Sequence, residues 1–280
     1  MTNDLNNKKN TTNQLRLQPN ISNNNLTKKV YGINEINETI NIDVVTEKPL
    51  TIYLNSQEIV TTMTLGDMPK ELSVGYLLNQ NMINKKDIIE NIDYDEDLDV
   101  VIIRTKRKTN YEKKLSKKIR TSGCAIGTVY GDMMETFYDI KLNDRAKIKS
   151  SWMMKISKAI TDIPSLYLKA GAIHGCALCL KDKVLAYVED VGRHNAVDKI
   201  AGWMFLNNIE GKDKIFYTTG RLTSEMIIKT VQMQIPILLS RSGFTESGVN
   251  LANEANLSLI GRMKGKRFIL LSGSHRVIYD

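Results

Sequence analysis

Short strands and one helix are predicted in the first third of the chain. Apolar and polar residues alternate between residues 42 and 63, which indicates two or three short strands. Pro69 then opens a predicted helix, because proline suits the first helical turn. Residues 99–104 return to the pattern of a strand. The apolar positions behind these predictions are Val44, Leu50, Ile52, Leu54, Ile59, Val60, Leu72, Val74, Leu77 and Leu78.

Strands and helices alternate through the second half. Beyond residue 192, an apolar stripe at the i, i+3, i+4, i+7 spacing predicts a helix. The stripe consists of Val197, Ile200, Ala201 and Met204. The repeated β-α-β order predicts a sheet covered by helices, with ligands bound where strand ends lead into helix N-termini. The predicted strands cover residues 177–180, 184–188, 215–219, 235–240, 257–260 and 268–271, and the other helices cover 155–160, 224–234 and 246–255.

Charge is concentrated in two segments of this 280-residue chain, whose formal net charge is +8. Residues 1–30 carry a net charge of +4 and nine asparagines, and too few apolar residues to offset the entropy of ordering, which predicts a disordered polar tail. Residues 104–120 hold nine basic side chains against Glu112. The remainder is ordinary for a globular protein, with 42% hydrophobic and 25% charged residues overall.

The sequence lacks the features expected of membrane and secreted proteins. There is no apolar run long enough to span a membrane and no apolar secretory region near residue 1. Three cysteines, an odd number, argue against a disulfide framework. We therefore expect a cytoplasmic, reduced protein that does not enter a membrane.

The stretch 189–199, Glu-Asp-Val-Gly-Arg-His-Asn-Ala-Val-Asp-Lys, joins a predicted strand to a predicted helix and is unusually polar. Gly192 is expected to take an unusual backbone angle at this junction. Arg193 and His194 would begin the helix, where their charge opposes the helix dipole unless an anion binds there. We predict that they bind an anion and that Asp190 and Asp198 orient the His194 ring.

An internal ionic cluster is the alternative for the same stretch. Glu189, Asp190, Arg193 and Lys199 alternate in sign and could pair with one another. Such a cluster explains the charge of the stretch, but it does not explain why a glycine, an arginine and a histidine stand together at the helix start.

Cys124 lies between Gly123 and Gly127, directly after the basic segment. Positive charge stabilises a thiolate, which is the nucleophile in sulfur chemistry, and the glycines are typical of a mobile loop. The alternative is a small buried cysteine, which is the commoner fate of a lone thiol.

His174, Cys176 and Cys179 have the spacing of a zinc half-site or of a redox pair. Their neighbours predict a strand, in which positions 176 and 179 point to opposite faces. The sequence also lacks the His-x-Glu and Pro-Cys-x-x-Cys signatures of zinc deaminases. We expect two structural cysteines and no bound metal ion.

Two basic turns follow predicted strands. The first is Thr219-Gly-Arg221, followed by Glu225 and Lys229, and the second is the run from Gly261 to Arg267. In the second turn, Gly265 stands between two lysines, which suits close approach of the backbone to a phosphate. With the start of the helix at residue 193, these turns suggest one pocket for a polyanionic small molecule.

These motifs together resemble the FdhD family of formate dehydrogenase accessory sulfurtransferases. They occur in the family's order over residues 40–272. The matching segments are Arg-Thr-Ser-Gly-Cys at 120–124, Gly-Ala-Ile-His at 171–174, the stretch 189–199, Thr-Gly-Arg-Leu-Thr-Ser-Glu-Met at 219–226 and Leu-Ile-Gly at 259–261.

The resemblance implies a specific activity. Such a sulfurtransferase accepts sulfur from a cysteine desulfurase as a persulfide and passes it to the molybdenum cofactor of formate dehydrogenase, Mo-bis(molybdopterin guanine dinucleotide). The position that matches the family's persulfide cysteine is Cys124, whereas the second loop cysteine of the family is replaced by Gly127. The cofactor-binding turn corresponds to Met263, Lys264, Gly265, Lys266, Arg267 and Phe268, to which we add Arg193 and His194.

The resemblance also implies a fold and an assembly. We expect an α/β protein with a cytidine deaminase-like three-layer α/β/α domain at residues 121–280 and a smaller α+β domain at 31–120. The family further implies a cytoplasmic homodimer that works with a cysteine desulfurase and with formate dehydrogenase.

Two other functions fit parts of the sequence. A guanine-nucleotide or cofactor-binding chaperone without sulfur chemistry would use the same pocket and would not need Cys124. A nucleic-acid binder would explain the basic segment. However, only 6% of residues are aromatic and the basic segment contains just one of them, Tyr111, so stacking recognition is unsupported and we predict no nucleic-acid partner.

Overall fold

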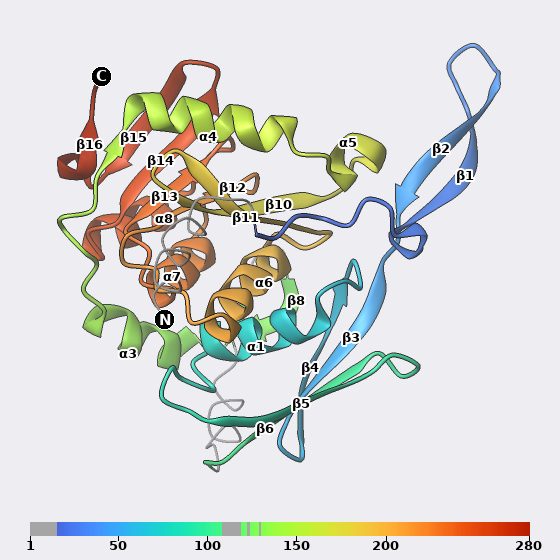
Figure 1. The fold of residues 1–280 in the computed structure, drawn as a ribbon, viewed down its shortest axis with the longest axis horizontal. Coiled ribbons are helices and arrows are strands. Elements are labelled where there is room, and N and C mark those ends of the chain that lie inside the picture. Colours follow the sequence, from blue (N-terminus) through green and yellow to red (C-terminus); the bar gives the residue numbers. More distant parts are fainter. Residues whose placement is uncertain (1–15, 108–118, 122–123, 129) are drawn as a thin grey trace, which may run out of the picture.

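The computed structural model describes residues 16–107, 119–121, 124–128 and 130–280. For residues 119–121, 124–128, 130–133 and 135 it describes the backbone alone. The chain folds into two lobes, with a two-stranded ribbon that projects from their junction (Figure 1). The predicted α/β fold is confirmed. Among the described residues, no helix combines the length and the apolar character needed to cross a membrane.

A six-stranded mixed sheet forms the centre of the larger lobe. Its strand order is β11-β10-β12-β13-β14-β15, with β12, β13 and β14 parallel and the other neighbours antiparallel. The parallel strands therefore end at one edge, where their loops lead into helices. The bounds are β10 His174–Leu180, β11 Lys183–Asp190, β12 Ile215–Thr218, β13 Ile237–Ser240, β14 Ser258–Lys264 and β15 Arg267–Ser272.

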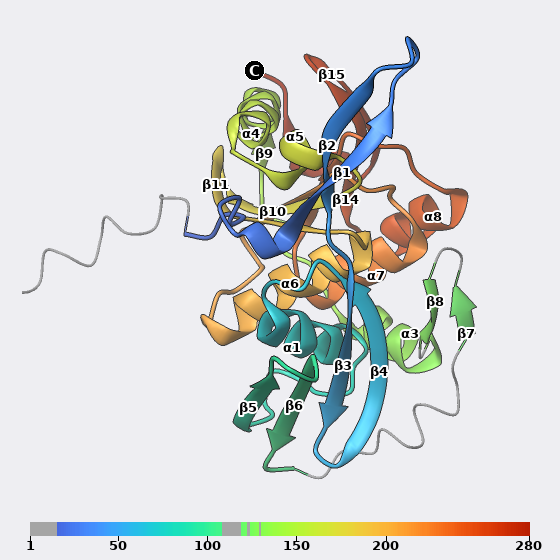
Figure 2. The same cartoon turned by 90° about the vertical axis from the view of Figure 1, so that its right-hand side faces the viewer.

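Helices cover both faces of this sheet, as the β-α-β order predicted. Helices α4 and α5 lie on one face, and α6, α7 and α8 lie on the other (Figures 1 and 2). Each face buries its own apolar core. The bounds are α4 Ser150–Asp162, α5 Leu166–Ala170, α6 Arg193–Leu206, α7 Ser224–Gln232 and α8 Glu246–Glu254.

The smaller lobe is a four-stranded sheet covered by one helix. The strand order is β4-β3-β6-β5, and α1 packs its apolar side chains against this sheet. Helix α1 begins at Pro69 as the sequence predicted. Strand β5 was not predicted. The bounds are β3 Lys48–Leu54, β4 Gln57–Thr64, α1 Pro69–Asn79, β5 Ile89–Asp95 and β6 Val100–Thr105.

The two lobes meet where helices α1 and α6 cross. Gly75 of α1 and Gly202 of α6 allow the backbones to touch, because a Cβ built on either glycine would collide with a carbonyl group of the other helix. Helix α6 is consequently buried on all sides, from His194 through Met204. It belongs to the cores of both lobes.

The segment before residue 31 is only partly the disordered tail that we predicted. Residues 1–15 lie outside the described residues, but Leu17 pairs with Ala186 on the free edge of β11. The amide of Arg16 donates to the carbonyl of Leu185, and the amide of Tyr187 donates to that of Leu17. The prediction is wrong for residues 16–30 because these backbone pairs and the buried side chain of Leu26 order the segment.

The remaining elements are short, apart from α3, and several had no sequence signal. Strands β1 and β2 form the projecting ribbon, while β7 and β8 form a separate hairpin next to α3 (Figure 2). Strand β16 near the C-terminus pairs with β9. The bounds are η2 Asn24–Leu26, β1 Thr27–Ile33, β2 Thr39–Val45, β7 Ile119–Thr121, β8 Cys124–Thr128, α3 Tyr130–Asp139, β9 Ile148–Lys149, η3 Ser274–Arg276 and β16 Val277–Ile278.

Candidate functional site

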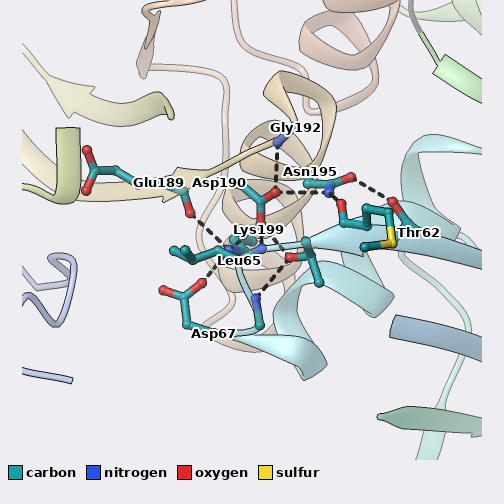
Figure 3. A network of polar contacts seen from close by, with 11 residues as sticks. Thr62, Leu65, Asp67, Glu189, Asp190, Gly192, Asn195 and Lys199 are labelled. Atoms are coloured by element: carbon teal, nitrogen blue, oxygen red, sulfur yellow. Dashed lines mark hydrogen bonds and ion pairs between the residues drawn. The ribbon is translucent and has the colours of Figure 1, made fainter. Parts of the chain in front are cut away.

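Asp190, the last residue of β11, is the centre of a buried polar network between the lobes (Figure 3). Its carboxylate accepts hydrogen bonds from the Thr64 hydroxyl at 2.5 Å, the Gly192 amide at 2.9 Å and the Asn195 side chain at 3.0 Å. Asn195 also donates to the carbonyl of Met63 at 2.7 Å. Strand β4 of the small lobe is thereby fixed to the start of α6.

Lys199 supplies the positive charge of this network. Its Nζ lies 2.6 Å from Asp190, donates to the carbonyl of Glu189 at 2.9 Å and also pairs with Asp67. Burial alone would lower the pKa of Lys199, but the two carboxylates outweigh burial and raise it above its usual value. The lysine is therefore charged in the folded protein.

Asp198 directly precedes Lys199 on α6, and its carboxylate connects three helices. Its carboxylate is 2.6 Å from Lys229 of α7 and accepts a hydrogen bond from Asn79 of α1 at 2.7 Å. The prediction that Asp190 and Asp198 orient His194 is wrong, because both carboxylates already bind lysine and amide groups from other elements. The alternative of an internal ionic cluster is right for Asp190 and Lys199.

Glu189 has a different structural role. Its carboxylate accepts from the backbone amides of Leu166 at 2.7 Å and Tyr167 at 3.2 Å, and so holds the first turn of α5. Burial raises the pKa of Glu189, whereas these amides lower it. The carboxylate satisfies helix-start amides that would otherwise be left without an intrahelical partner.

His194 is oriented by Glu225 of α7. The Nε2 atom lies 3.0 Å from a carboxylate oxygen of Glu225, and both side chains are almost fully buried. Burial lowers the pKa of His194, Glu225 opposes that shift, and Lys229 and Arg193 reinforce it. The predicted unusual angle at Gly192 is wrong, because its φ is −97°. A side chain there would be tight, since a Cβ would lie 3.0 Å from the Asn195 side chain and would require it to shift.

Cationic side chains gather beside His174 at the edge where the parallel strands end. Burial lowers the pKa of His174, and the charges of Arg193, Arg221, His194 and Arg241 lower it further. Arg193 begins α6, Arg221 follows β12 and Arg241 follows β13. The Arg241 guanidinium stacks on the Tyr167 ring at 4.9 Å, which fixes its position. We name Arg193, Arg221 and Arg241, together with His174, the edge cluster.

The turn after β12 that carries Arg221 is held rigidly. The Ser240 hydroxyl donates to the carbonyl of Gly220 at 2.7 Å, and the Gly220 amide donates to the Thr218 hydroxyl at 3.0 Å. A Cβ on Gly220 would lie 3.2 Å from Arg193. The ends of β12 and β13 and the start of α6 therefore form one rigid edge that carries cationic side chains.

The basic turn at residues 262–268 forms a second cationic surface. It tops the β14–β15 hairpin around an open cavity of about 490 Å³. Gly265 has a φ of 58° and forms the turn itself, so its role is conformational. The cavity is lined by Arg262, Lys264, Lys266, Arg267, Phe268 and Ile269.

This cavity differs from the predicted pocket in two respects. Arg193 and His194 do not line it, because the hairpin extends β14 beyond the ends of β12 and β13. The two cationic surfaces are nevertheless neighbours, since the Arg262 amide donates to the carbonyl of Ser242, just after β13. Met263 packs into the apolar core under α4, so its side chain does not face the cavity.

The three cysteines occupy different environments. Cys124 is the first residue of β8 and pairs with Thr121, so its backbone belongs to a hairpin where we had predicted a loop. Cys176 and Cys179 are fully buried on opposite faces of the sheet, as predicted. Burial raises the pKa of Cys176 to about 12 and also raises that of Cys179. Within the described ranges, no cluster of three or more histidine, cysteine or acidic residues could hold a metal ion.

Sequence reasoning missed the partners that complete these sites. Asp67 and Asn79 belong to the small lobe and meet α6 more than 100 residues later in the chain. Arg241 follows a predicted strand in the same way as Arg221, and that repeated position was a usable signal. Tyr167 gave no signal, since α5 is only five residues long.

The fold and site define a class: a two-lobed α/β protein that presents fixed cations at the ends of parallel strands, with a cysteine hairpin outside the main sheet. The sequence model of the FdhD/NarQ family matches residues 45–278. The chain therefore belongs to the FdhD/NarQ family.

Named relatives agree with this assignment. A sulfur carrier protein FdhD from Listeria monocytogenes serotype 4b is 30% identical over 253 residues, covering 86% of this chain and 93% of the relative. Another from Bacillus pumilus is 29% identical over 236 residues, covering 84% and 90%. The fold is similar to the crystal structure of a protein assigned as a formate dehydrogenase accessory protein from Desulfotalea psychrophila. The TM-score is 0.73 at 24% identity, covering 90% of this chain and 98% of that one.

Proposed function

We propose that this protein is a cytoplasmic sulfurtransferase that serves formate dehydrogenase. It accepts sulfur from a cysteine desulfurase as a persulfide on Cys124. It then transfers that sulfur to the molybdenum cofactor, Mo-bis(molybdopterin guanine dinucleotide), before formate dehydrogenase receives the cofactor. The names of the relatives support the sulfur-carrier role and the connection to formate dehydrogenase.

The edge cluster is the observation that carries the proposal. Three arginines converge on His174 at helix and strand ends, which is an arrangement suited to phosphate groups. The cofactor is the substrate here, and its pyrophosphate groups are its most strongly charged parts. Arg193 would contact a phosphate directly, and the buried His194 would support the site from beneath.

The basic turn would hold a second anionic part of the same substrate. Lys264, Lys266 and Arg267 line an open cavity next to the edge cluster, and the Phe268 ring adds an apolar wall. Met263 would contribute through its backbone, because its side chain is buried. Two neighbouring cationic surfaces suit a ligand with phosphates at two places better than they suit a mononucleotide.

Cys124 is the thiol best suited to carry sulfur. Cys176 and Cys179 are fully buried, and the raised pKa of each keeps it protonated. In the proposed step, the Cys124 thiolate attacks the terminal sulfur of the desulfurase persulfide. One S–S bond forms, another breaks and the desulfurase leaves as a thiolate, so no oxidant is required. Because Gly127 replaces the second loop cysteine of the family, this carriage uses a single thiol.

Intact-mass spectrometry after incubation with a cysteine desulfurase and cysteine tests the proposal. We expect a gain of about 32 Da, one sulfur atom, mapped to Cys124 and removed by a thiol reductant. The Cys176→Ser variant is the matched control and should keep the gain, whereas Cys124→Ser should lose it. A gain that survives in Cys124→Ser would contradict the proposal.

The same variants separate this function from a cofactor-binding chaperone without sulfur chemistry. Both functions require Cys124→Ser to bind guanosine diphosphate as tightly as the wild type. Only sulfur transfer requires that variant to fail in restoring formate dehydrogenase activity to cells that lack the protein. Full activity with Cys124→Ser would favour the chaperone.

A further inference from the structure

Tyr279, near the C-terminal end of the chain, stacks on one residue of the basic-turn cavity. Its ring centroid lies 6.2 Å from that of Phe268, and the two ring planes are 18° apart. This spacing falls within the range of stacked aromatic pairs. Phe268 lines the cavity, whereas Tyr279 contacts Phe268 from outside the cavity lining. We therefore expect Tyr279 to act on the cavity through the Phe268 ring. Tyr279 also lies one residue beyond the match to the FdhD/NarQ family.

The apolar core does not account for the position of Tyr279. Its side chain is 69% exposed, while Phe268 is half-buried. Exposed side chains usually change rotamer on a fast timescale, because little packs against them. The backbone on either side of Tyr279 must therefore set where its ring lies.

Arg276 anchors the backbone before Tyr279. Its side chain is fully buried and donates to the carbonyls of Asn256 at 2.6 Å and Asn143 at 2.9 Å, and it pairs with Asp144 at 3.1 Å. Strand β16 follows and pairs with β9 in parallel. The segment is thereby tied to the loops that precede β9 and β14.

Asp280 anchors the backbone after Tyr279, at the start of α4 (Figure 1). Its carboxylate accepts hydrogen bonds from the Ser150 hydroxyl at 3.0 Å, the Ser151 amide at 3.0 Å and the Ser151 hydroxyl at 2.9 Å. The Ser151 amide and the two hydroxyls lower the pKa of Asp280 to about 2, so this carboxylate is charged at neutral pH. A negative charge is favourable at a helix start. The exposed Tyr279 ring is thus held by an anchor on each side.

We infer that Tyr279 is a positioning residue of the substrate site, whose ring holds the Phe268 ring as a flat wall against which a heterocyclic ring of the substrate stacks. The inference rests on the proposed function, in which the basic turn binds part of a guanine-containing substrate. Lys264, Lys266 and Arg267 supply positive charge for phosphates, and an aromatic face beside them suits a base. Without Tyr279, the Phe268 ring loses one of its supports and turns away from the cavity more easily.

Titration calorimetry of the full chain with guanosine diphosphate and with inorganic pyrophosphate tests the inference. Both ligands carry a diphosphate, so the ratio of their dissociation constants isolates the contribution of the nucleoside. Tyr279→Ala should lower the preference for guanosine diphosphate about fivefold, as expected for one aromatic contact, and should leave pyrophosphate binding unchanged. Tyr279→Phe keeps the ring and should bind both ligands as the wild type does. Tyr31→Ala removes a tyrosine of β1 that is 77% exposed, and this matched control should change neither affinity.

A double-mutant cycle tests whether Tyr279 acts through Phe268. Phe268→Leu should lower the preference for guanosine diphosphate about tenfold, because the stacking surface is lost. Adding Tyr279→Ala to that variant should cause little further loss, since the ring that Tyr279 supports is already gone. Losses that simply add would overturn the positioning role.

The outcomes for this inference and for the proposed function are distinguishable. Because Tyr279 is mostly exposed, its variants should have the circular dichroism spectrum of the wild type. An unchanged preference in Tyr279→Ala, or a wild type without any preference, would overturn the inference alone, because the gain of sulfur on Cys124 is measured separately. A wild type that binds neither ligand would overturn the proposed substrate site as well.

Discussion

Replacing Lys199 with methionine is expected to destabilise the protein by about 3 kcal/mol, near the lower end of the 3–5 kcal/mol lost when a buried ion pair loses one partner. The side chains of Lys199 and Asp190 are both fully buried, and their charged atoms are 2.6 Å apart. Without the ammonium group, Asp190 keeps hydrogen bonds from Thr64, Gly192 and Asn195. These donors partly compensate the stranded carboxylate, which is why we expect the lower value.

Urea unfolding followed by circular dichroism at pH 7 measures this loss as a lower midpoint with an unchanged denaturant slope. The matched control is Lys155→Met. Lys155 pairs with Asp182 at 3.1 Å, but its side chain is 62% exposed, so its loss should cost at most about 1 kcal/mol. The comparison holds the substitution constant and varies the burial of the ion pair.

Two results would refute this account of the network. One is a loss for Lys199→Met no larger than that for Lys155→Met. The other concerns the double variant Lys199→Met with Asp190→Asn, which should be more stable than Lys199→Met alone because the fully buried carboxylate of Asp190 is no longer stranded. If removing the Asp190 charge gives no recovery, the carboxylate was not the cause of the loss. The raised pKa of Lys199 adds stability at every pH below its unfolded value of 10.5, and this stability is lost only as pH rises through the folded pKa.

Three further outcomes are expected. Gly202→Ala should cost about 1–3 kcal/mol in urea unfolding because the new methyl group meets the carbonyl of Glu71, although alanine usually stabilises a helix by about 1 kcal/mol; a gain would disprove the close helix crossing. The lowered pKa of His194 means that the folded state resists its protonation, so stability present above pH 6.5 should fall as pH drops toward the folded pKa. Unfolding measured from pH 7.5 to 5 should show a flatter slope for His194→Gln, and an equal slope would contradict the assignment. Arg241→Ala should weaken guanosine diphosphate binding about tenfold by calorimetry, as expected for one charge-assisted hydrogen bond; Arg104→Ala on β6 is the control, and equal effects would show that the edge cluster is not the site.

The sequence predicted those helices and strands whose apolar residues recur at a regular spacing over several turns or residues. The stripe from Val197 to Met204 predicted α6, and alternation predicted β3 and β4. Strand β5 alternates in the same way through Ile92 and Tyr94 and was predictable, whereas the five-residue α5 is too short to leave a period.

The candidate site was likewise predictable only in part from the sequence. Glycine, arginine and histidine at a strand end correctly marked the start of α6 as a place where cations meet. The partners of Asp190 and Asp198 could not be predicted from local spacing. Thr64 and Asn79 are more than 100 residues away in sequence, and only tertiary packing brings them into hydrogen-bonding distance. Local spacing indicated His194 as the partner of both carboxylates, but the carboxylates bind the distant groups instead.

The crossing of α1 and α6 has a consequence for the newly made chain. The small lobe is complete in sequence by residue 105, yet the partners of Thr64 and Asn79 appear only near residues 190 and 198. Until the ribosome has delivered those residues, the face of α1 around Gly75 is uncovered and the polar groups beside it have no protein partners. The first lobe is therefore expected to remain loosely packed during synthesis, and both lobes should consolidate together after α6 has left the ribosome.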